Sequence, residues 1–248
     1  MTKPPAPGRT AAPWNGTIPR TRLFDALSLL LPAGESFVVD ALEAWASASD
    51  SLDDRAKAEL GRFIREERAH QRAHRLYNEV LVARAPSALA VAQRAERAVA
   101  ELQRLPLVQR VALAAAFEQL TAVISHEVLA HPHLLAHDEP ASSEVRLWRW
   151  HAAEELRHCH VATRAAGACG VGLPGRAAAQ CMASAYLAFD VLRGWAALCA
   201  SDMASGAGRL RICADTLAFA IRSVPSLARM TIGWWRCLIF PYAAGRSA

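Results

Sequence analysis

The chain has 248 residues, of which 53% are hydrophobic and 21% are charged, and it carries a formal net charge of +5. This length suits one large helical domain, and the lack of Lys/Arg blocks or of interleaved aromatic and basic residues argues against nucleic acid as a partner. Its six cysteines form no Cys-x-x-Cys pair, so we expect reduced thiols in a helical core rather than a disulfide framework.

The N-terminal segment, residues 1–20, is rich in proline and has no apolar stretch of the kind found in secretory signals. We expect it to be a flexible tail, and we expect the protein to be cytoplasmic. A first helix is predicted over residues 34–48. A second is predicted to begin after Asp53, a suitable N-cap, and to end shortly before Pro86.

Five more helices are predicted by apolar residues that recur with the period of a helix, and prolines or glycines separate them. They cover residues 88–105, 107–130, 142–168, 175–200 and 210–239. No stretch of useful length alternates apolar and polar residues as a half-buried strand would. The chain is therefore predicted to be all-α, with a bundle over residues 21–170 and apolar helices of residues 171–248 packed on the same domain.

The last two predicted helices are very apolar, but charged residues such as Asp190, Arg193 and Arg222 interrupt them. Spanning a membrane takes about 20 predominantly apolar residues, so neither is expected to do so. We expect these helices to cover the bundle or to form the face of a homodimer. A peripheral contact with a membrane and a channel for an apolar substrate are the alternatives, because Trp234 and Trp235 stand among arginines, which suits an interface.

The pattern Glu-Glu-x-x-His occurs twice, as Glu66-Glu67-Arg68-Ala69-His70 and as Glu154-Glu155-Leu156-Arg157-His158. Both copies lie inside predicted helices, where residues three apart share one face. Each copy can therefore direct its second carboxylate and its imidazole at one point, which makes half of a metal site. The first glutamate of each copy is expected to face solvent.

Two further glutamates can complete the site. Glu35 precedes the first copy, and Glu118 the second, by similar lengths of chain, each enough for a helix, a connection and the return of the next helix. The order Glu, then Glu-x-x-His, is that of the dinuclear carboxylate centre in ferritin-like four-helix bundles. The predicted ligands of two metal ions are Glu35, Glu67, His70, Glu118, Glu155 and His158, with His74 as an additional ligand.

Some of these assignments have alternatives. His74 and His151 share the helical faces of the two motifs, so each could bind metal, hold a ligand carboxylate in place, or only fill space. Glu35 follows a Pro-Ala-Gly run and could instead be an acid that favours the start of a helix. Glu127 is a reserve ligand, although it faces roughly the opposite side of its helix from Glu118.

The same residues resemble a bacterial family of predicted metal-dependent hydrolases, whose helices are similar to the ferritin-like arrangement. The resemblance covers roughly residues 22–200. It is carried by residues 32–37 with their Gly-Glu, residues 63–70 followed by His74 and Asn78, residues 116–118 followed by Thr121 and Ala122, and residues 150–155 followed by His158. The chain departs from the family pattern at Ala73, where the family has Glu, and at Gln119, where it has His. These departures leave the predicted ligands intact and affect only the groups around them.

Carboxylate and imidazole ligands without a thiolate suit iron or manganese and would admit zinc. We therefore expect two metal ions per chain, with iron favoured, in an oxidase or oxygenase of a small organic substrate. Glu118 is its expected catalytic residue, with His74 as a proton relay. Hydrolysis by a metal-bridged hydroxide is the alternative, and it is what the name of the resembled family implies. Iron storage ranks lower, because a storage subunit would not need the long apolar C-terminal helices.

Overall fold

The structure is a computed structural model, and it describes residues 13–49, 52–136 and 141–239. These residues form helices and no strand, which confirms the all-α prediction. The helices are α1 (Ile18–Ser47), α2 (Asp54–Arg84), α3 (Pro86–Leu102), α4 (Leu107–Ala130), α5 (Ser143–Ala168), α6 (Leu173–Ala204) and α7 (Arg209–Ile239). Most of their bounds lie within a few residues of those expected from the sequence.

Local signals explain where several helices begin and end. Asp53 caps α2 by accepting a hydrogen bond from the backbone N–H of Ala56 at 2.7 Å, and Ser142 caps α5 by accepting one from Val145 at 3.1 Å. After α5 the chain turns at Gly170, whose φ of 72° is a conformation that glycine adopts without strain. These caps fix the ends of the two helices that carry the Glu-Glu-x-x-His motifs.

Helix α1 is longer than the sequence predicted. A start at Gly34 was expected, but the helix is continuous from Ile18 and passes through Pro32. Proline removes one backbone hydrogen bond there, yet Leu29 on one side of it and Phe37 on the other are both buried, and that burial favours an unbroken helix. Glu35 therefore lies inside a helix, so its position is not explained by the attraction of an acid to a helix N-terminus.

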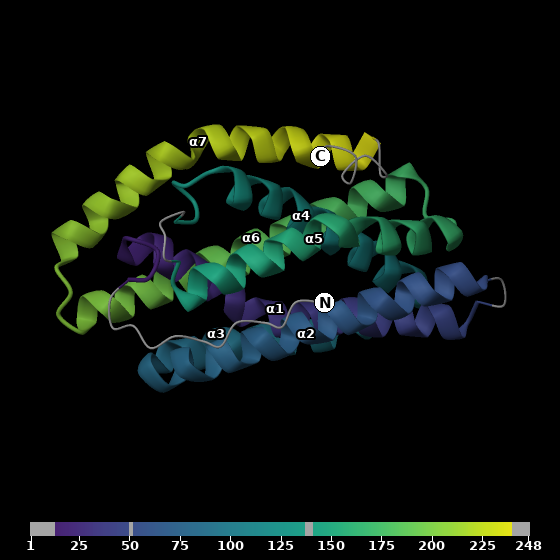
Figure 1. The fold of residues 1–248 in the computed structure, drawn as a ribbon, viewed down its shortest axis with the longest axis horizontal. Helices are drawn as coiled ribbons and strands as arrows, with labels where there is room; N and C mark the ends of the chain where they lie inside the picture. Colours follow the sequence, from purple (N-terminus) through teal and green to yellow (C-terminus); the bar gives the residue numbers. More distant parts are fainter. Residues whose placement is uncertain (1–12, 50–51, 137–140, 240–248) are drawn as a thin grey trace.

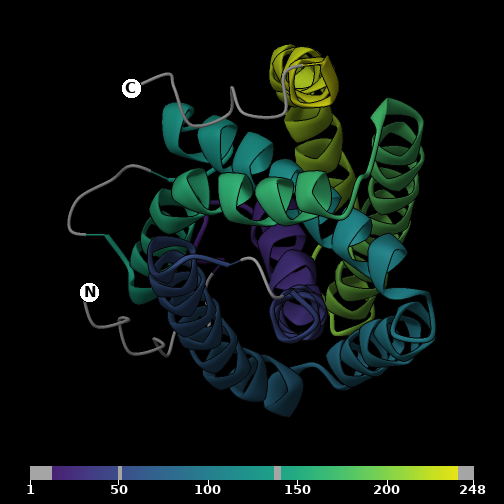
Figure 2. The same ribbon diagram turned by 90° about the vertical axis from the view of Figure 1, so that its right-hand side faces the viewer.

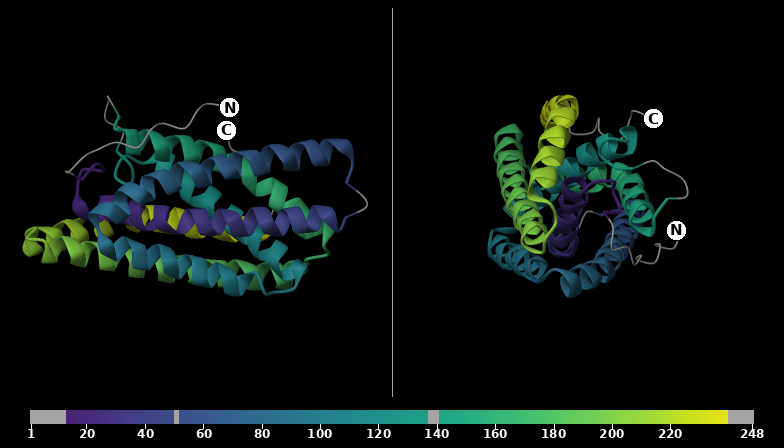
Figure 3. Two further views of the ribbon diagram at one scale, coloured as in Figure 1. Left: turned by 90° about the horizontal axis from the view of Figure 1, so that it is seen from below. Right: turned by 90° about the vertical axis from the view of Figure 1, so that its left-hand side faces the viewer.

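The helices run roughly along one axis and enclose α1 (Figures 1 and 3). Seen end-on, α1 lies near the middle, with α2 and α3 on one side of it, α4 and α5 on the other, and α6 and α7 at the flank (Figure 2). Phe37 of α1, Phe63 of α2 and Leu113 of α4 are among the largest buried side chains of the core, and their helices also carry glutamates of the sequence pattern.

The residues just before α1 are part of the packed fold. The indole N–H of Trp14 donates to the hydroxyl of Tyr77 at 2.9 Å, and its ring meets the ring of Phe24 edge-on with centroids 5.8 Å apart. The segment predicted as a tail is thus anchored from Trp14 onward, while its residues 1–12 lie outside the described part of the chain. All six cysteines are free, and three of them, Cys159, Cys199 and Cys237, are buried.

The outer surface of the bundle is apolar along α7. Its outward side carries large side chains that are each more than half exposed, namely Leu210, Leu217, Ile221, Val224, Leu227, Ile232, Trp235 and Ile239. Among the described helices, only α4 is long and apolar enough to cross a membrane, and half of its apolar window is buried inside the bundle. The exposed apolar surface and the membrane-compatible helix are therefore different elements.

Candidate metal centre

Four helices bring the six predicted ligands to one buried place in the bundle. Helix α1 contributes a glutamate, α4 contributes a second, and each of α2 and α5 contributes the Glu and His of its motif. None of these side chains belongs to a residue more than 6% exposed: Glu35, Glu67, His70, Glu118, Glu155 and His158. The two halves of the sequence therefore meet at one site.

The four motif residues are within ligand distance of one another. Nδ1 of His70 lies 3.6 Å from Oε1 of Glu67 and 3.3 Å from Oε1 of Glu155. Nδ1 of His158 lies 2.6 Å from the same oxygen of Glu67 and 3.5 Å from that of Glu155. One donor atom from each of the four residues falls within 4.8 Å of all the others, which is the spacing a bound cation requires.

Many donor atoms in this cluster make no well-aligned hydrogen bond with a described residue, although Nδ1 of His158 and Oε1 of Glu67 lie in close contact as an ion pair. The donor atoms without such a hydrogen bond are both carboxylate oxygens of Glu35 and of Glu67, Oε2 of Glu118 and of Glu155, and Nδ1 of His70 and of His158. Leaving one buried polar group unpaired costs about 1–3 kcal/mol, so a fold does not gather this many in one place for stability. The donors fit a metal centre, because metal ions would satisfy all of them together.

The other nitrogen of each motif histidine is held by the opposite motif. Nε2 of His70 lies 3.1 Å from Oε2 of Glu154, and Nε2 of His158 lies 2.9 Å from Oε2 of Glu66. Both glutamates are only 8% exposed, so the expectation that they face solvent was wrong. The signal for them was present in the sequence, since the first glutamate is repeated in both copies of the motif.

These crossed pairs yield a first testable prediction. Replacing Glu154 with alanine should weaken metal binding about 10–100-fold, because the carboxylate fixes the ring orientation of His70 and increases its basicity. Glu154→Gln, which keeps an oxygen that can accept the Nε2–H hydrogen bond, should lose less. Metal affinity measured by competition with a chelator would test this, and equal affinities for the wild type and Glu154→Ala would contradict it.

Charges within the metal-free site are balanced by protons. Burial, followed by the nearby charge of Glu67, raises the pKa of Glu35 and of Glu118 well above the usual range, which favours the protonated form of both carboxyl groups. Burial alone would raise the pKa of Glu155, but hydrogen bonding to His158 and His70 outweighs it and lowers that pKa well below the usual value. The pKa of Glu67 is lowered for the same reason.

The pKa values of the two motif histidines are raised. Burial lowers the pKa of an imidazole, but the carboxylates around His158, chiefly Glu155 and Glu67, outweigh it and raise that pKa to about 11. The pKa of His70 is raised well above its usual value by Glu154, Glu155 and Glu67 against the same effect of burial. Without metal, two imidazolium ions thus neutralise two carboxylates, and metal ions would have to replace these protons.

His74 and His151 lie beside this cluster. Burial lowers the pKa of His74 well below the usual value and that of His151 to about 4, so both rings are neutral. The hydroxyl of Ser28 donates to Oδ1 of Asn78 at 2.7 Å, so it must accept a hydrogen bond from Nδ1 of His74, 2.8 Å away. Nε2 of His74 is then the unprotonated ring nitrogen, and its lone pair has no hydrogen-bond partner among the described residues.

The structure places these two histidines differently with respect to the predicted ligands. His151 shares a group of converging donors with Glu35 and His70, and its Nδ1 lies 3.9 Å from Oε1 of Glu35. His74 belongs to neither converging group, and its ring centroid is 4.9 Å from that of His151. Its role as an additional ligand or proton relay stays a prediction.

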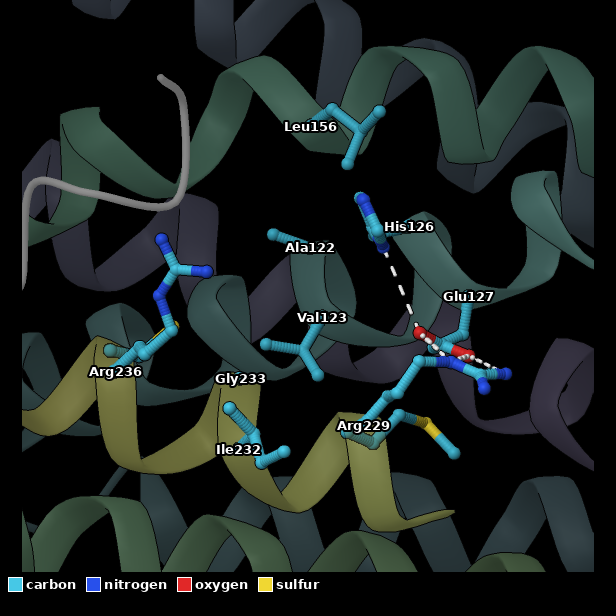
Figure 4. Close-up of a pocket in the computed structure, with 11 residues that line it drawn as sticks. Ala122, Val123, His126, Glu127, Leu156, Arg229, Ile232, Gly233 and Arg236 are labelled. Carbon is cyan, nitrogen blue, oxygen red and sulfur yellow. Dashed lines mark hydrogen bonds and ion pairs between the residues drawn. The ribbon is translucent and has the colours of Figure 1, made fainter. Parts of the chain in front are cut away.

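Glu127, the reserve ligand, points elsewhere. Its carboxylate receives hydrogen bonds from Nε of Arg229 in α7 at 3.0 and 3.1 Å, beside a cavity of about 240 Å³ between α4 and α7 (Figure 4). Burial raises the pKa of Glu127, but the arginine outweighs it and lowers that pKa. A carboxylate that already accepts these hydrogen bonds is not available as a reserve ligand. This agrees with its position on the opposite side of the helix from Glu118.

Comparisons with known proteins support the resemblance noted in the sequence. A family model described as "predicted metal-dependent hydrolase" matches residues 8–243, which is nearly the whole chain. No curated protein and no solved structure matches the chain.

Proposed function

The chain belongs to the family of predicted metal-dependent hydrolases, and we propose that its buried carboxylate and histidine cluster is an active site that holds two metal ions. The proposed ligands are Glu35, Glu67, His70, Glu118, Glu155 and His158. This proposal rests above all on one observation, namely that buried Glu and His donor atoms from α1, α2 and α5 converge in two groups that share His70. Glu118 of α4 lines the same cavity as Glu35, Glu67 and Glu155. The order of ligands along the chain supports a ferritin-like arrangement.

Among the chemistries open to such a site, we propose oxidation of a small organic substrate. A donor set of carboxylates and imidazoles without thiolate suits iron or manganese, with zinc as a possible occupant. Iron, when bound, would supply the redox chemistry and bind dioxygen. The chain's own residues would shape the reaction: Glu35 and Glu118 line a cavity together with the ligands Glu67 and Glu155, and Nε2 of His74, which has no partner among the described residues, offers a lone pair that can accept a hydrogen bond.

Metal-dependent hydrolysis is the second candidate, and the description of the family favours it. In that case the ions would lower the pKa of a bound water, and a nearby glutamate or histidine would act as general base. The described residues that line the adjacent cavity include no lysine, arginine or histidine. Apart from the metal ions, a negatively charged ester would therefore meet no cationic group among the described lining residues, which makes an uncharged substrate the better fit for either reaction.

Elemental analysis and one optical experiment would decide between these functions. The protein would be purified without added metal, its metal content measured, and the spectrum of the reduced protein recorded before and after exposure to air. About two irons per chain and an oxygen-dependent charge-transfer band are expected. Two zinc ions with a spectrum indifferent to oxygen would favour hydrolysis, loading far beyond two ions would indicate storage, and no bound metal would refute the proposed site.

The protons held by the metal-free site yield a second prediction, on pH. Because the pKa values of His70 and His158 are raised, these rings carry protons at neutral pH that metal ions must displace. Metal affinity should therefore fall as pH decreases, by up to about tenfold per pH unit for each proton released. Titration of Mn²⁺ into weakly buffered protein with a pH-sensitive dye should detect release of at least two protons per chain, and binding without proton release would contradict the prediction.

A further inference from the structure

A cavity of about 70 Å³ lies directly against the proposed metal ligands. Four carboxylates form its inner end, from Glu35, Glu67, Glu118 and Glu155. The space is several times what one water molecule needs. It is enclosed by α1, α3, α4 and α6, so a molecule that fills it reaches the ligand carboxylates from the side of α3 and α6.

The walls of this cavity are mostly apolar, although Tyr186, whose hydroxyl makes no well-aligned hydrogen bond with a described residue, is also among the lining residues. The ring of Phe117 meets the ring of Phe37 edge to face, with centroids 6.1 Å apart, and it meets the ring of Tyr186 in the same way, with centroids 6.3 Å apart. A row of three rings therefore runs along the cavity. Leu31 of α1 and Val99 of α3 add aliphatic surface. The hydroxyl of Thr121, which also lines the cavity, is already used, because it donates to the backbone oxygen of Glu118 at 3.1 Å.

Charge decides which part of a ligand such a cavity can accept. None of the described residues that line it is a lysine, an arginine or a histidine, and its inner end is built from carboxyl groups. An anionic group held between the apolar walls would lose its hydration and find no cationic side chain among the described lining residues, which costs several kcal/mol. An alkyl group would lose only contact with water, which is favourable.

Gly34 leaves part of this space open. It lies in the middle of α1 and lines the cavity, and a Cβ atom at this position would meet no other atom within 4 Å. Glycine inside a helix is less stable than alanine by about 0.5–1 kcal/mol, and packing does not demand it here. The missing side chain instead widens the cavity one residue away from the carboxylate of Glu35.

We propose that this cavity binds an uncharged, straight alkyl group of the substrate, and that Gly34 determines how much of that group can enter. This inference rests on the proposed function, since it assumes that the carboxylates at the inner end belong to the metal centre. The substrate would then present a saturated carbon to that centre, with any charged group left outside the cavity.

The test uses the full chain and a series of primary alcohols from 1-butanol to 1-decanol, with sodium octanoate and sodium octanedioate as charged probes. Binding to the wild type, followed by calorimetry, should strengthen about threefold to fourfold for each added methylene until the cavity is full. Octanoate can leave its carboxylate outside the cavity, so it should respond to the variants below as 1-octanol does. Octanedioate, which has a carboxylate at each end, should bind at least tenfold more weakly than 1-octanol to chelator-treated protein, in which no bound cation can attract it. Octanedioate binding as tightly as 1-octanol would overturn the proposal.

Variants then locate the binding. Gly34→Phe should fill the cavity, so that affinity stops rising at an alcohol several carbons shorter than in the wild type. Gly34→Ala, the matched control, should keep most of the gain in affinity with chain length. Val99→Phe, which narrows the same cavity from α3, serves as a second blocking variant if Gly34→Phe does not fold. Alcohol binding that neither blocking variant weakens would overturn the proposal. Metal content measured on the same samples distinguishes the proposed metal site from the proposed alkyl-binding cavity. Alcohol binding with no bound metal would refute only the proposed function.

Discussion

Replacing Glu118 with glutamine is expected to abolish tight binding of at least one metal ion and, at the same time, to stabilise the metal-free protein. The pKa of Glu118 is raised by its burial and by the charges of Glu67 and Glu155, so above the pKa of the unfolded chain the folded state must either take up a proton or hold an unfavourable buried charge. For an acid with a raised pKa, that requirement lowers stability at every pH above its unfolded value. Glutamine is neutral without it, and a gain of about 0.5–2 kcal/mol is expected.

Metal content and denaturant unfolding of the metal-free protein would measure both effects. Glu127→Gln is the matched control, because it lies on the same helix and is also buried but is paired with Arg229. That control should keep its metal and lose stability instead. A Glu118→Gln protein with full metal content would remove Glu118 from the ligand set, and a large loss of stability in the metal-free form would show that the carboxyl is a structural group.

Replacing His158 with alanine is expected to abolish metal binding and also to destabilise the metal-free protein, by about 3–5 kcal/mol. The imidazolium of His158 faces Glu66 at 2.9 Å through Nε2, and it faces Glu67 and Glu155 through Nδ1. Removing it leaves buried carboxylates without their counter-charge. Activity should fall to background, because a ligand and a positive charge are lost together.

His160→Ala is the control for this variant. His160 lies two residues further along α5, with its side chain 38% exposed, and it pairs with Glu59 at 2.7 Å. An ion pair near the surface contributes about 1 kcal/mol or less, so this change should be mild and should leave the metal content intact. If His158→Ala were as mild as His160→Ala and still bound metal, both the charge balance of the site and the ligand assignment would be refuted.

The two ligands thus have opposite expected effects on the metal-free fold, although both should be needed for metal. The stabilising effect of removing Glu118 would mark it as a residue kept for function at the expense of stability. The destabilising effect of removing His158 would show that part of the same site also holds the bundle together. Neither outcome could be anticipated from the motif, since both depend on which neighbours each side chain meets.

The sequence predicted much of the site because the period of a helix places Glu67 with His70, and Glu155 with His158, on one face. The partners of Glu66 and Glu154 were missed, because the period says which way a side chain points on its own helix but not what the opposite helix presents there. For the same reason the helical period could not show which of His74 and His151 lies closer to the other donor atoms. Their distances to the other donors depend on how α2 and α5 cross, which is set by side-chain packing along both helices.

The continuation of α1 through Pro32 shows a different limit of prediction from local sequence. Proline and glycine are the strongest local signals for a helix end, and the Pro-Ala-Gly run was interpreted in that way. Burial of apolar residues on both sides of the run outweighs the lost hydrogen bond, and this gain arises only when the other helices are in place. Local signals therefore predicted the ends of α2 and α5 but misplaced the start of α1.

The crossed pairs between the two motifs also bear on how the site takes up metal. Since His70 is held by Glu154 and His158 by Glu66, neither α2 nor α5 can slide along the other without breaking a buried hydrogen bond. These hydrogen bonds fix the register of the two helices without using the donor atoms that are proposed to bind metal. Metal uptake then requires an exchange of ions for protons within a preorganised cage and little movement of the backbone, so the free and loaded proteins should have nearly the same shape.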